Sequence, residues 1–105
     1  IDIERVTITK GWFNETLNDE TAQKINLSKI SIVYIDCDIY ESAEVAFRFI
    51  KNRLSNGAFV MIDDFTSIDK NGNYIAKCFF EVFKDRDILF FDTYSNGQTY
   101  RIFNN

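Results

Sequence analysis

The sequence predicts an α/β fold organised around one βαβ unit, and three observations support this prediction. Two apolar runs, residues 30–35 and 58–62, have the length and composition of buried strands. Residues 42–55 between them repeat apolar side chains with a helical period, so the two strands should lie parallel in a right-handed crossover. Each strand also runs directly into acidic residues, which are Asp36, Asp38, Asp63 and Asp64.

Composition restricts the class of protein. With 105 residues, 46% of them hydrophobic, the chain is large enough for one domain spanning residues 1–105 and too apolar to be disordered. A net charge of −4 gives no electrostatic reason to expect nucleic acid as a partner. No apolar run approaches the ~20 residues that span a bilayer, and no signal peptide is visible. We therefore expect a cytoplasmic protein without a membrane partner.

Cysteine and histidine usage restricts the chemistry. Cys37 and Cys78 are the two cysteines, and the chain has no histidine. Because the cysteines lack C-x-x-C spacing, neither a disulfide framework nor a zinc site is predicted. We expect Cys37 to pack as a small residue behind the acidic segment and Cys78 to lie in the core. Acid–base chemistry must then use carboxylates, Lys, Tyr or Cys.

The first part of the chain is less regular. Residues 6–9 are β-branched and predict a short strand that ends at Gly11. Residues 14–24 are mostly polar and predict a loop or a short exposed helix that leads to the strand at Ile30. The chain has no initiating Met. We expect it to be part of a longer protein.

Two helices are expected. The first covers residues 42–55, with Ser42 as its N-cap and Gly57 as its C′ residue. The second covers residues 74–84, where apolar side chains recur at helical spacing. The polar loop before it, residues 66–73, would lie at the mouth of a site at the sheet edge.

The C-terminal segment predicts a β-hairpin. Residues 88–91 are a compact apolar run, and residues 98–103 return as a partner strand. Asn96-Gly97 is the strongest short hairpin signal, because a type I′ turn needs positive φ at both central residues. The expected order is strand, loop, strand, helix, strand, helix and hairpin.

The acidic residues predict a metal site. Parallel strands bring their carboxyl ends to the same sheet edge, where open α/β sheets bind ligands. Neighbouring carboxylates repel one another unless a cation compensates, and oxygen ligands favour Mg²⁺, then Mn²⁺ or Ca²⁺. We assign Asp36, Asp63 and Asp64 to the metal, and Asp38 to the role of general base on a hydroxyl. The alternative is that these aspartates only turn the chain and remain solvated.

Three segments resemble the macrocin O-methyltransferase (TylF-type) family. Residues 35–42 (I-D-C-D-I-Y-E-S) and 57–65 (G-A-F-V-M-I-D-D-F) are similar to motifs that follow two adjacent strands in this family. Residues 10–17 (K-G-W-F-N-E-T-L) are similar to a segment upstream of them. The three motifs are specific when taken together, whereas D-x-D alone is a weak signal.

The resemblance implies a Rossmann-like methyltransferase that depends on S-adenosylmethionine and Mg²⁺. Its acceptor would be a hydroxyl of a sugar, a natural product or a glycan. By position, Asp36, Asp63 and Asp64 match the metal ligands of the family and Asp38 its proposed base. The acceptor itself cannot be read from this stretch, because acceptor loops vary freely.

The resemblance also implies cofactor-binding residues. Gly11, Trp12 and Phe13 fall where such enzymes meet the adenine end of the cofactor. The glycine-rich loop of the family is missing, so we expect the C-terminal portion of the domain, inactive alone. In the family's strand order, 3-2-1-4-5-7-6, two absent strands would separate the strand at Val6 from the strand at Ile30. The edge left exposed predicts association between chains as a homo-oligomer.

Two other functions stay open at this point. Haloacid-dehalogenase-like phosphatases also carry D-x-D after an apolar strand. Their motif requires Thr or Val two residues past the second Asp, where this chain has Tyr40. A non-catalytic α/β module that binds a metal or a partner is the other alternative.

Overall fold

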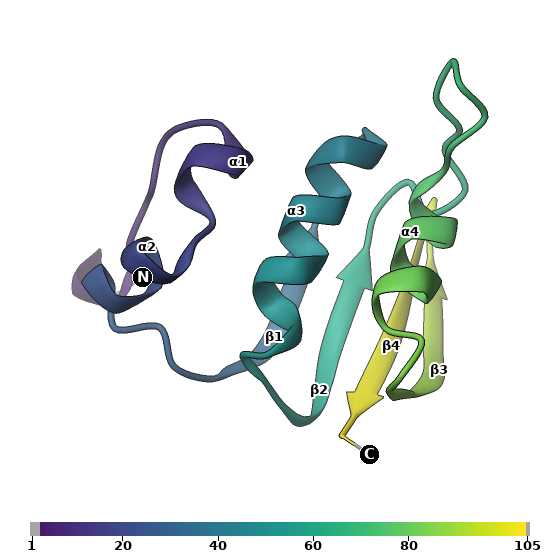
Figure 1. Ribbon diagram of the computed structural model, residues 1–105. Coiled ribbons are helices and arrows are strands. Elements are labelled where there is room, and N and C mark those ends of the chain that lie inside the picture. The colour runs from purple at the N-terminus through teal and green to yellow at the C-terminus, as the bar shows by residue number, and fades with distance from the viewer. Residues whose placement is uncertain (1–2, 105) are drawn as a thin grey trace.

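Strands β1 (Ile30–Ile35) and β2 (Leu54–Ile62) pair in parallel, as the sequence predicts. The computed structural model describes residues 3–104 and contains a four-stranded sheet with helices packed on it (Figure 1). Strands β3 (Asp87–Tyr94) and β4 (Gly97–Phe103) add an antiparallel hairpin, and the strand order is β1-β2-β4-β3. This order matches the last four strands of the expected Rossmann-like sheet, so the α/β prediction is confirmed.

The crossover helix α3 (Tyr40–Lys51) begins and ends earlier than predicted. No side chain caps its N-terminus, and Ser42 lies in its first turn instead of at the N-cap. The helix can start directly after the acidic segment because Asp38 turns the chain with a φ of +61°. At the other end, the backbone N–H of Ile30 donates to the Arg53 carbonyl at 2.8 Å. The chain thus begins to pair with β1 directly after α3, and the helix ends there.

Gly57 lies inside β2, so its prediction as the residue that terminates α3 is wrong. Its φ is +81°, and a Cβ there would meet the Arg101 guanidinium at 2.7 Å. The Arg101 Nε–H donates to the Gly57 carbonyl at 3.0 Å. The register between β1 and β2 shifts between Ile30 and Ile32. Gly57 therefore lies in an irregular stretch of β2, where the backbone has a positive φ and a side chain would not fit.

Helices α3 and α4 (Ile75–Val82) pack against each other and on the sheet. Phe47 of α3 contacts Phe79 and Phe83, with ring centroids 5.5 and 6.1 Å apart, and all three side chains are fully buried. Val60 of β2 is fully buried in the same cluster. Burying one such side chain contributes ~1.5–3 kcal/mol, so this core holds both helices over the sheet.

The hairpin forms where it is predicted, but its turn is not the predicted type I′. Tyr94 pairs with Gly97, and the positive φ of +40° falls on Ser95. A glycine is required at position 97 for steric reasons instead, because a Cβ there would lie 2.3 Å from the Tyr94 ring. The hairpin therefore lays the Tyr94 ring directly against the backbone of β4.

The polar segment before β1 forms two short helices, α1 (Phe13–Thr16) and α2 (Asp19–Lys24). Asn18 caps α2, since its Oδ1 accepts from the Thr21 backbone N–H at 2.9 Å. α1 packs against α3. This contact places the residues that precede α1 beside the crossover helix.

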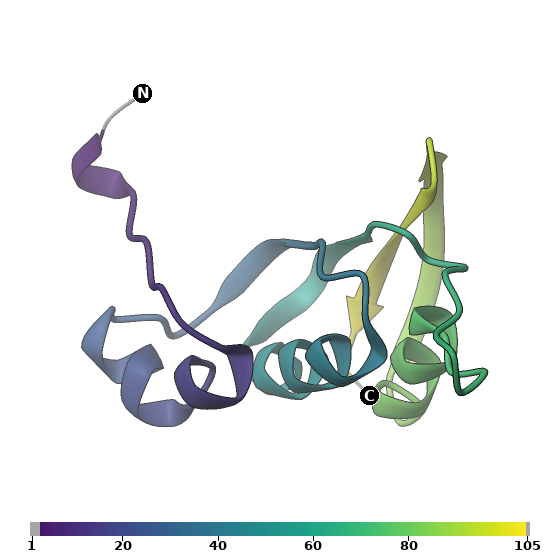
Figure 2. The ribbon, with the colours of Figure 1, turned by 90° about the horizontal axis from the view of Figure 1, so that it is seen from above.

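The strand predicted at residues 6–9 does not form. A 3₁₀ turn, η1 (Ile3–Arg5), precedes an irregular segment that lies away from the sheet (Figure 2). Val6 is 53% exposed and Ile8 82%. β-branched composition does not suffice, because a strand needs a hydrogen-bonding partner, and within residues 3–104 no strand pairs with this segment.

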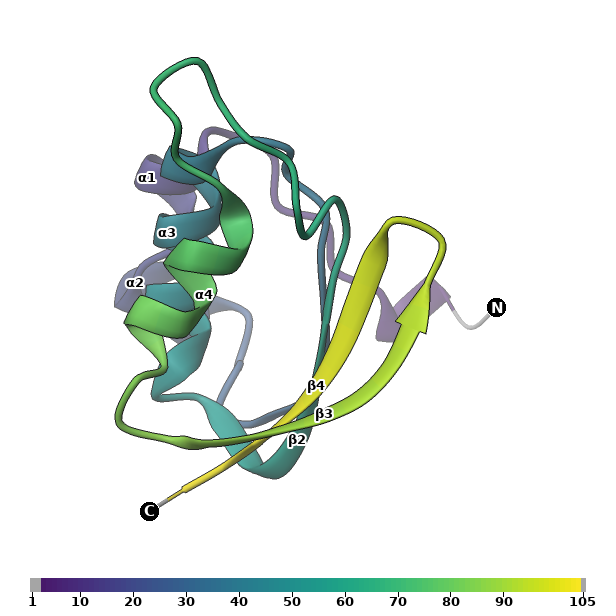
Figure 3. The ribbon, with the colours of Figure 1, turned by 90° about the vertical axis from the view of Figure 1, so that its right-hand side faces the viewer.

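The four α-helices of the described residues lie on one side of the sheet, where α3 and α4 cover the strands and α1 and α2 lie next to α3 beyond the β1 edge; the other face carries no α-helix (Figures 2 and 3). Exposed apolar side chains lie on this helix-free face, where Phe59 and Phe91 are in edge-to-face contact with ring centroids 5.0 Å apart. Ile32 of β1 is 68% exposed. β1 pairs only with β2 in this part of the chain, so one face and one edge are open to association.

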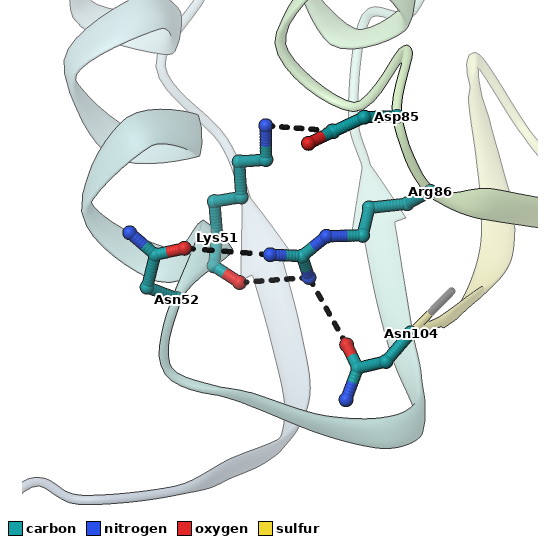
Figure 4. A network of polar contacts seen from close by, with 5 residues as sticks. All are labelled: Lys51, Asn52, Asp85, Arg86 and Asn104. Carbon is teal, nitrogen blue, oxygen red and sulfur yellow. Dashed lines mark hydrogen bonds and ion pairs between the residues drawn. The ribbon is translucent and has the colours of Figure 1, made fainter.

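A network of polar contacts lies at the C-terminal end of α3 (Figure 4). The acidic residues lie at the other end of this helix. Arg86 donates to the Lys51 carbonyl at 3.3 Å, to Asn52 Oδ1 at 3.3 Å and to Asn104 Oδ1 at 3.1 Å. Lys51 Nζ in turn pairs with Asp85 at 2.7 Å. The network joins the end of α3, the start of the hairpin and the C-terminal end of β4.

Candidate metal and cofactor site

The acidic residues leave the sheet at the C-terminal edge of β1 and β2. Ile35 and Ile62 are register partners, and the backbone N–H of Asp63 donates to the Ile35 carbonyl at 2.9 Å. The ladder therefore continues past the ends of both strands. Asp36 and Asp63 emerge side by side, as the parallel arrangement predicts.

Three carboxylates lie within reach of one cation. One oxygen from each of Asp36, Asp38 and Asp64 lies within 4.8 Å of the others. Asp63 lies close enough to share a proton with Asp36 and with Asp64, and Asp38 lies close enough to share one with Asp64. The four groups thus form one connected set, to which we refer as the carboxylate cluster. Two carboxylates can stay this close only with a proton or a cation between them.

Asp38 and Asp64 have left-handed backbone conformations, with φ of +61° and +49°. A non-glycine residue pays roughly 1–2 kcal/mol for this conformation, although Asp tolerates it better than most. Each kink lies where the chain leaves a strand. Both kinked residues belong to the group of three carboxylates that lie within reach of one cation, so the strained backbone lies at the candidate site itself.

The carboxylates of the cluster repel one another, and a positive charge would offset this repulsion. Desolvation and the neighbouring charge of Asp63 raise the pKa of Asp36. The hydrogen bond from Asp38, desolvation and the charge of Asp63 raise the pKa of Asp64 to about 6. Every charged group that acts on these two carboxyls, within the described residues, is another carboxylate. A hard divalent cation fits this donor set, because all of its ligands are oxygens.

The structure brings all four predicted aspartates together, but it does not divide them into ligands and base. Asp38, predicted as the base, has a carboxylate oxygen within 4.8 Å of oxygens of both Asp36 and Asp64. Asp63, predicted as a ligand, is not in this group of three and joins it through Asp36 and Asp64. Geometry alone therefore leaves the assignment of roles as a proposal.

The residues predicted to bind the cofactor lie beside α3. Gly11, with a φ of +139°, leads into Trp12, whose side chain is 76% exposed. Trp12 and Phe13 line a hollow together with Glu41 and Ser42 of the first turn of α3. An exposed indole next to a carboxylate and a hydroxyl suits a flat ligand that carries hydrogen-bonding groups.

A second hollow has lining residues from both this region and the carboxylate cluster. Phe13, Asp36 and Ile50 of α3 are among them, and its volume is about 280 Å³. Pockets for drug-sized ligands usually measure ~300–1,000 Å³, so this hollow by itself accommodates only part of a nucleoside cofactor. Phe13 belongs to both hollows, and it thereby relates the predicted cofactor residues to the predicted metal site.

Cys37 takes no part in the cluster. Its side chain is half-buried on the other side of the strand end, with Sγ 3.9 Å from the Ile39 carbonyl. Burial raises the pKa of its thiol to about 11, so a thiolate ligand or nucleophile is not available near neutral pH. Cys78 is buried in the core, as predicted.

Sequence reasoning missed two tyrosines beside the cluster. Tyr34 precedes Asp36 by two residues in β1, so strand alternation could have placed it on the same face. Tyr94 comes from β3, and its ring centroid lies 6.4 Å from that of Tyr34. Nothing in the local sequence indicates this second contact, because it depends on how the hairpin folds over the sheet.

Comparison with known proteins identifies the relatives of the chain. A family model described as Macrocin-O-methyltransferase (TylF) matches residues 1–92. The chain belongs to this family. Membership in the macrocin O-methyltransferase family confirms the resemblance carried by the motifs at residues 10–17, 35–42 and 57–65, and it favours the methyltransferase interpretation over a haloacid-dehalogenase-like phosphatase.

Two relatives illustrate the match to the TylF family. An 8-demethyl-8-(2,3-dimethoxy-alpha-L-rhamnosyl)-tetracenomycin-C 4′-O-methyltransferase from Streptomyces olivaceus is 34% identical over 62 residues, which are 59% of this chain and 22% of that protein. The apo structure of a TDP-rhamnose 3′-O-methyltransferase of calicheamicin biosynthesis superposes with a TM-score of 0.67 at 17% identity. That superposition covers 89% of this chain and 39% of the other, and it shows a shared fold.

The chain therefore spans about a fifth of the curated relative and two fifths of the solved structure. Among the described residues, none of the helices has the length and apolar character that crossing a membrane requires.

Proposed function

We propose that this chain is part of an O-methyltransferase that uses S-adenosylmethionine and Mg²⁺ to methylate a sugar hydroxyl. The observation that carries the proposal is the convergence of four aspartates at one sheet edge in a member of the macrocin O-methyltransferase family. Such a cluster lacks a compensating charge in the described residues, and a divalent cation would supply it.

Asp36, Asp63 and Asp64 would hold the metal, which when bound lowers the pKa of a hydroxyl placed against it. Asp38 would accept the proton of that hydroxyl. Its carboxyl lies beside the proposed ligands, so the proton has a short path. When bound, the cofactor would supply the methyl group from its sulfonium, and Asp38 would take the proton that the hydroxyl gives up, so that charge would be conserved.

The residues around Trp12 would hold one end of the cofactor. Trp12 and Phe13 offer aromatic surfaces, and Glu41 offers a hydrogen-bond acceptor in the same hollow. The hollow between Phe13 and Asp36 would direct the rest of the cofactor toward the carboxylate cluster. Because the 105 residues include no glycine-rich loop, we expect this segment by itself to bind metal without transferring a methyl group.

The acceptor class is proposed from the curated relative, whose name describes methylation of a rhamnosyl group on tetracenomycin C. A sugar hydroxyl has a high pKa, and this chain offers carboxylates in place of histidine for its deprotonation. We propose a deoxysugar of a glycosylated natural product as the acceptor, with residues 66–73 forming part of its binding surface.

The test is methyl transfer by the full-length protein from labelled S-adenosylmethionine to sugar acceptors, with Mg²⁺ or with EDTA. Asp63→Asn should abolish transfer, whereas Asp87→Asn should not, because Asp87 is an exposed aspartate at the start of β3. Metal-independent transfer, or full activity of Asp63→Asn, would contradict the proposal. A stand-alone binding module would bind Mg²⁺ but transfer no methyl group to any acceptor.

We also propose that the 105-residue chain, taken by itself, self-associates through the outer edge of β1 and the helix-free face. β1 pairs on one side only in the described residues, and Ile32 exposes 68% of its surface there. An unpaired edge strand is a template for a second copy. Light scattering should show a dimer or larger assembly that Ile32→Lys weakens. A monomeric wild-type protein at micromolar concentration would refute this part of the proposal.

A further inference from the structure

The hydroxyl group of Tyr94 is a buried polar atom that makes no hydrogen bond of good geometry among the described residues, although the Tyr34 phenol lies close enough to act on it. Buried side-chain oxygens in folded proteins nearly always have a partner, so an exception asks for an explanation. The aromatic ring itself is well packed against Gly97 and Tyr34. The unpaired hydroxyl therefore belongs to a side chain with a defined position.

The position of the ring follows from Gly97. An ideal Cβ built on Gly97 would lie 2.3 Å from Cζ and 2.5 Å from Oη of Tyr94, and 2.7 Å from the Ile62 carbonyl oxygen. The phenol thus occupies the space that a side chain at position 97 would take. Its hydroxyl lies next to the last residue of β2, one residue before Asp63.

The Tyr34 phenol and the carboxylates of Asp63 and Asp36 act on this hydroxyl. Burial raises the pKa of Tyr94 to about 12, and the neighbouring Tyr34 phenol and the charge of Asp63 contribute to this rise. The charge of Asp36 acts in the same direction. The phenol stays protonated near neutral pH, and it is a hydrogen-bond donor that faces the carboxylate cluster.

The hairpin is also tied to the acidic segment. The backbone N–H of Phe65, the residue after Asp64, donates to the Asn96 carbonyl at 3.2 Å. This bond connects the turn that follows Tyr94 to the segment that carries Asp63 and Asp64. The donor and the carboxylates are therefore held by the same part of the backbone.

We propose that Tyr94 is a positioning residue for the carboxylate cluster, and that its Oη–H donates to the Asp63 carboxylate when a divalent cation is bound. This inference rests on the proposed function. In the structure, Asp63 interacts with Asp36 and Asp64, and the Tyr94 hydroxyl has no well-formed acceptor. With a cation held by these carboxylates, the contacts between them would no longer be needed, and Asp63 would be free to accept from Tyr94. Ligating carboxylates are ordinarily held by such donors.

The test compares Tyr94→Phe with Tyr100→Phe in the full-length protein. Tyr100 is a second buried tyrosine of the hairpin, but its hydroxyl donates to Gln98 Oε1 at 2.5 Å. Mg²⁺ and Mn²⁺ affinities are measured by calorimetric titration, and unfolding temperatures are measured in EDTA and in excess Mg²⁺. We expect Tyr94→Phe to weaken Mg²⁺ binding ~10-fold, since loss of a residue that supports a metal ligand typically costs 10–100-fold.

The two variants should separate in EDTA. Tyr94→Phe should leave the unfolding temperature unchanged or higher, because the lost hydroxyl makes no well-formed hydrogen bond in the metal-free protein. Tyr100→Phe should lower the unfolding temperature and keep the wild-type Mg²⁺ affinity. Wild-type Mg²⁺ affinity in Tyr94→Phe would overturn the inference and leave the proposed function standing. A lower unfolding temperature of Tyr94→Phe in EDTA would also overturn it. Absence of Mg²⁺ binding by the wild-type protein would overturn both.

Discussion

Carboxylate oxygens of Asp38 and Asp64 lie within 4.8 Å of each other although the two residues follow different strands, and both residues have left-handed backbone conformations. Each residue lies at the point where the chain turns away from the sheet edge. A shared proton or a bound cation can hold such a pair together. The choice between proton and cation gives the cluster a dependence on pH and on metal.

The stability of the metal-free protein should depend on Asp64. Its pKa is about 6 in the folded chain against an ordinary value of 3.8, so the folded state holds this proton more tightly than the unfolded state. The stabilisation is complete below pH ~3.8 and is lost as the pH rises through ~6. In EDTA, thermal unfolding should therefore show a decline in this contribution between about pH 4 and pH 7.

Asp64→Asn is the control for this pH dependence. The variant should lose the part of the slope that the wild-type protein shows across that range, because the amide does not titrate. Added Mg²⁺ should stabilise the wild-type protein more at pH 7.5 than at pH 5, since protons and metal compete for the same oxygens. Equal stabilisation at both values would argue against a shared site.

The roles of Asp38 and Asp63 should separate on mutation. Asp38→Asn should reduce methyl transfer by about 10²–10⁴-fold, the usual contribution of a general base, and largely keep Mg²⁺ binding. Asp63→Asn should lose Mg²⁺ affinity as well. Calorimetric Mg²⁺ titration and single-turnover rates measure the two effects. If Asp38→Asn loses metal binding as completely as Asp63→Asn, Asp38 is a ligand and the base is another group.

Trp12→Ala should impair use of the cofactor without unfolding the protein. The side chain is 76% exposed, so its removal costs little packing. We expect the KM for S-adenosylmethionine to rise by about tenfold, the loss of one aromatic stacking contact, with unchanged Mg²⁺ affinity. Ile8→Ala is the matched control, since Ile8 is 82% exposed and lines none of the hollows described. An unchanged KM for Trp12→Ala would remove residue 12 from the cofactor site.

Arg86→Ala should reduce stability and leave the site intact. Arg86 donates to groups on α3 and on the C-terminal end of β4, at the end of the domain far from the carboxylate cluster (Figure 4). We expect the free energy of unfolding to fall by about 1–3 kcal/mol in urea titration, with wild-type Mg²⁺ affinity. Arg48→Ala, which removes an exposed ion pair with Glu44, should cost only about 0.3–0.5 kcal/mol. Equal losses in the two variants would show that the Arg86 network is not structural.

Local patterns were sufficient for the parts of the fold that depend on neighbours in sequence. The apolar runs at residues 30–35 and 58–62 and the helical repeat between them predict a parallel pair, which the structure confirms. Helix ends were predicted less well, because the start of α3 depends on the kink at Asp38 and its end on pairing by Ile30. The segment at residues 6–9 has strand composition, but no strand pairs with it in the described chain.

The sequence by itself determined that two acidic segments follow two adjacent parallel strands, because strand period and crossover handedness leave little choice. Tertiary packing sets the contacts among the four carboxyl groups and places the Tyr94 phenol beside them, with no well-formed hydrogen bond. These relationships depend on φ values at two kinks and on the folding of the hairpin over Gly97. Contacts between distant segments arise from packing of the whole sheet, which no local pattern of residues encodes.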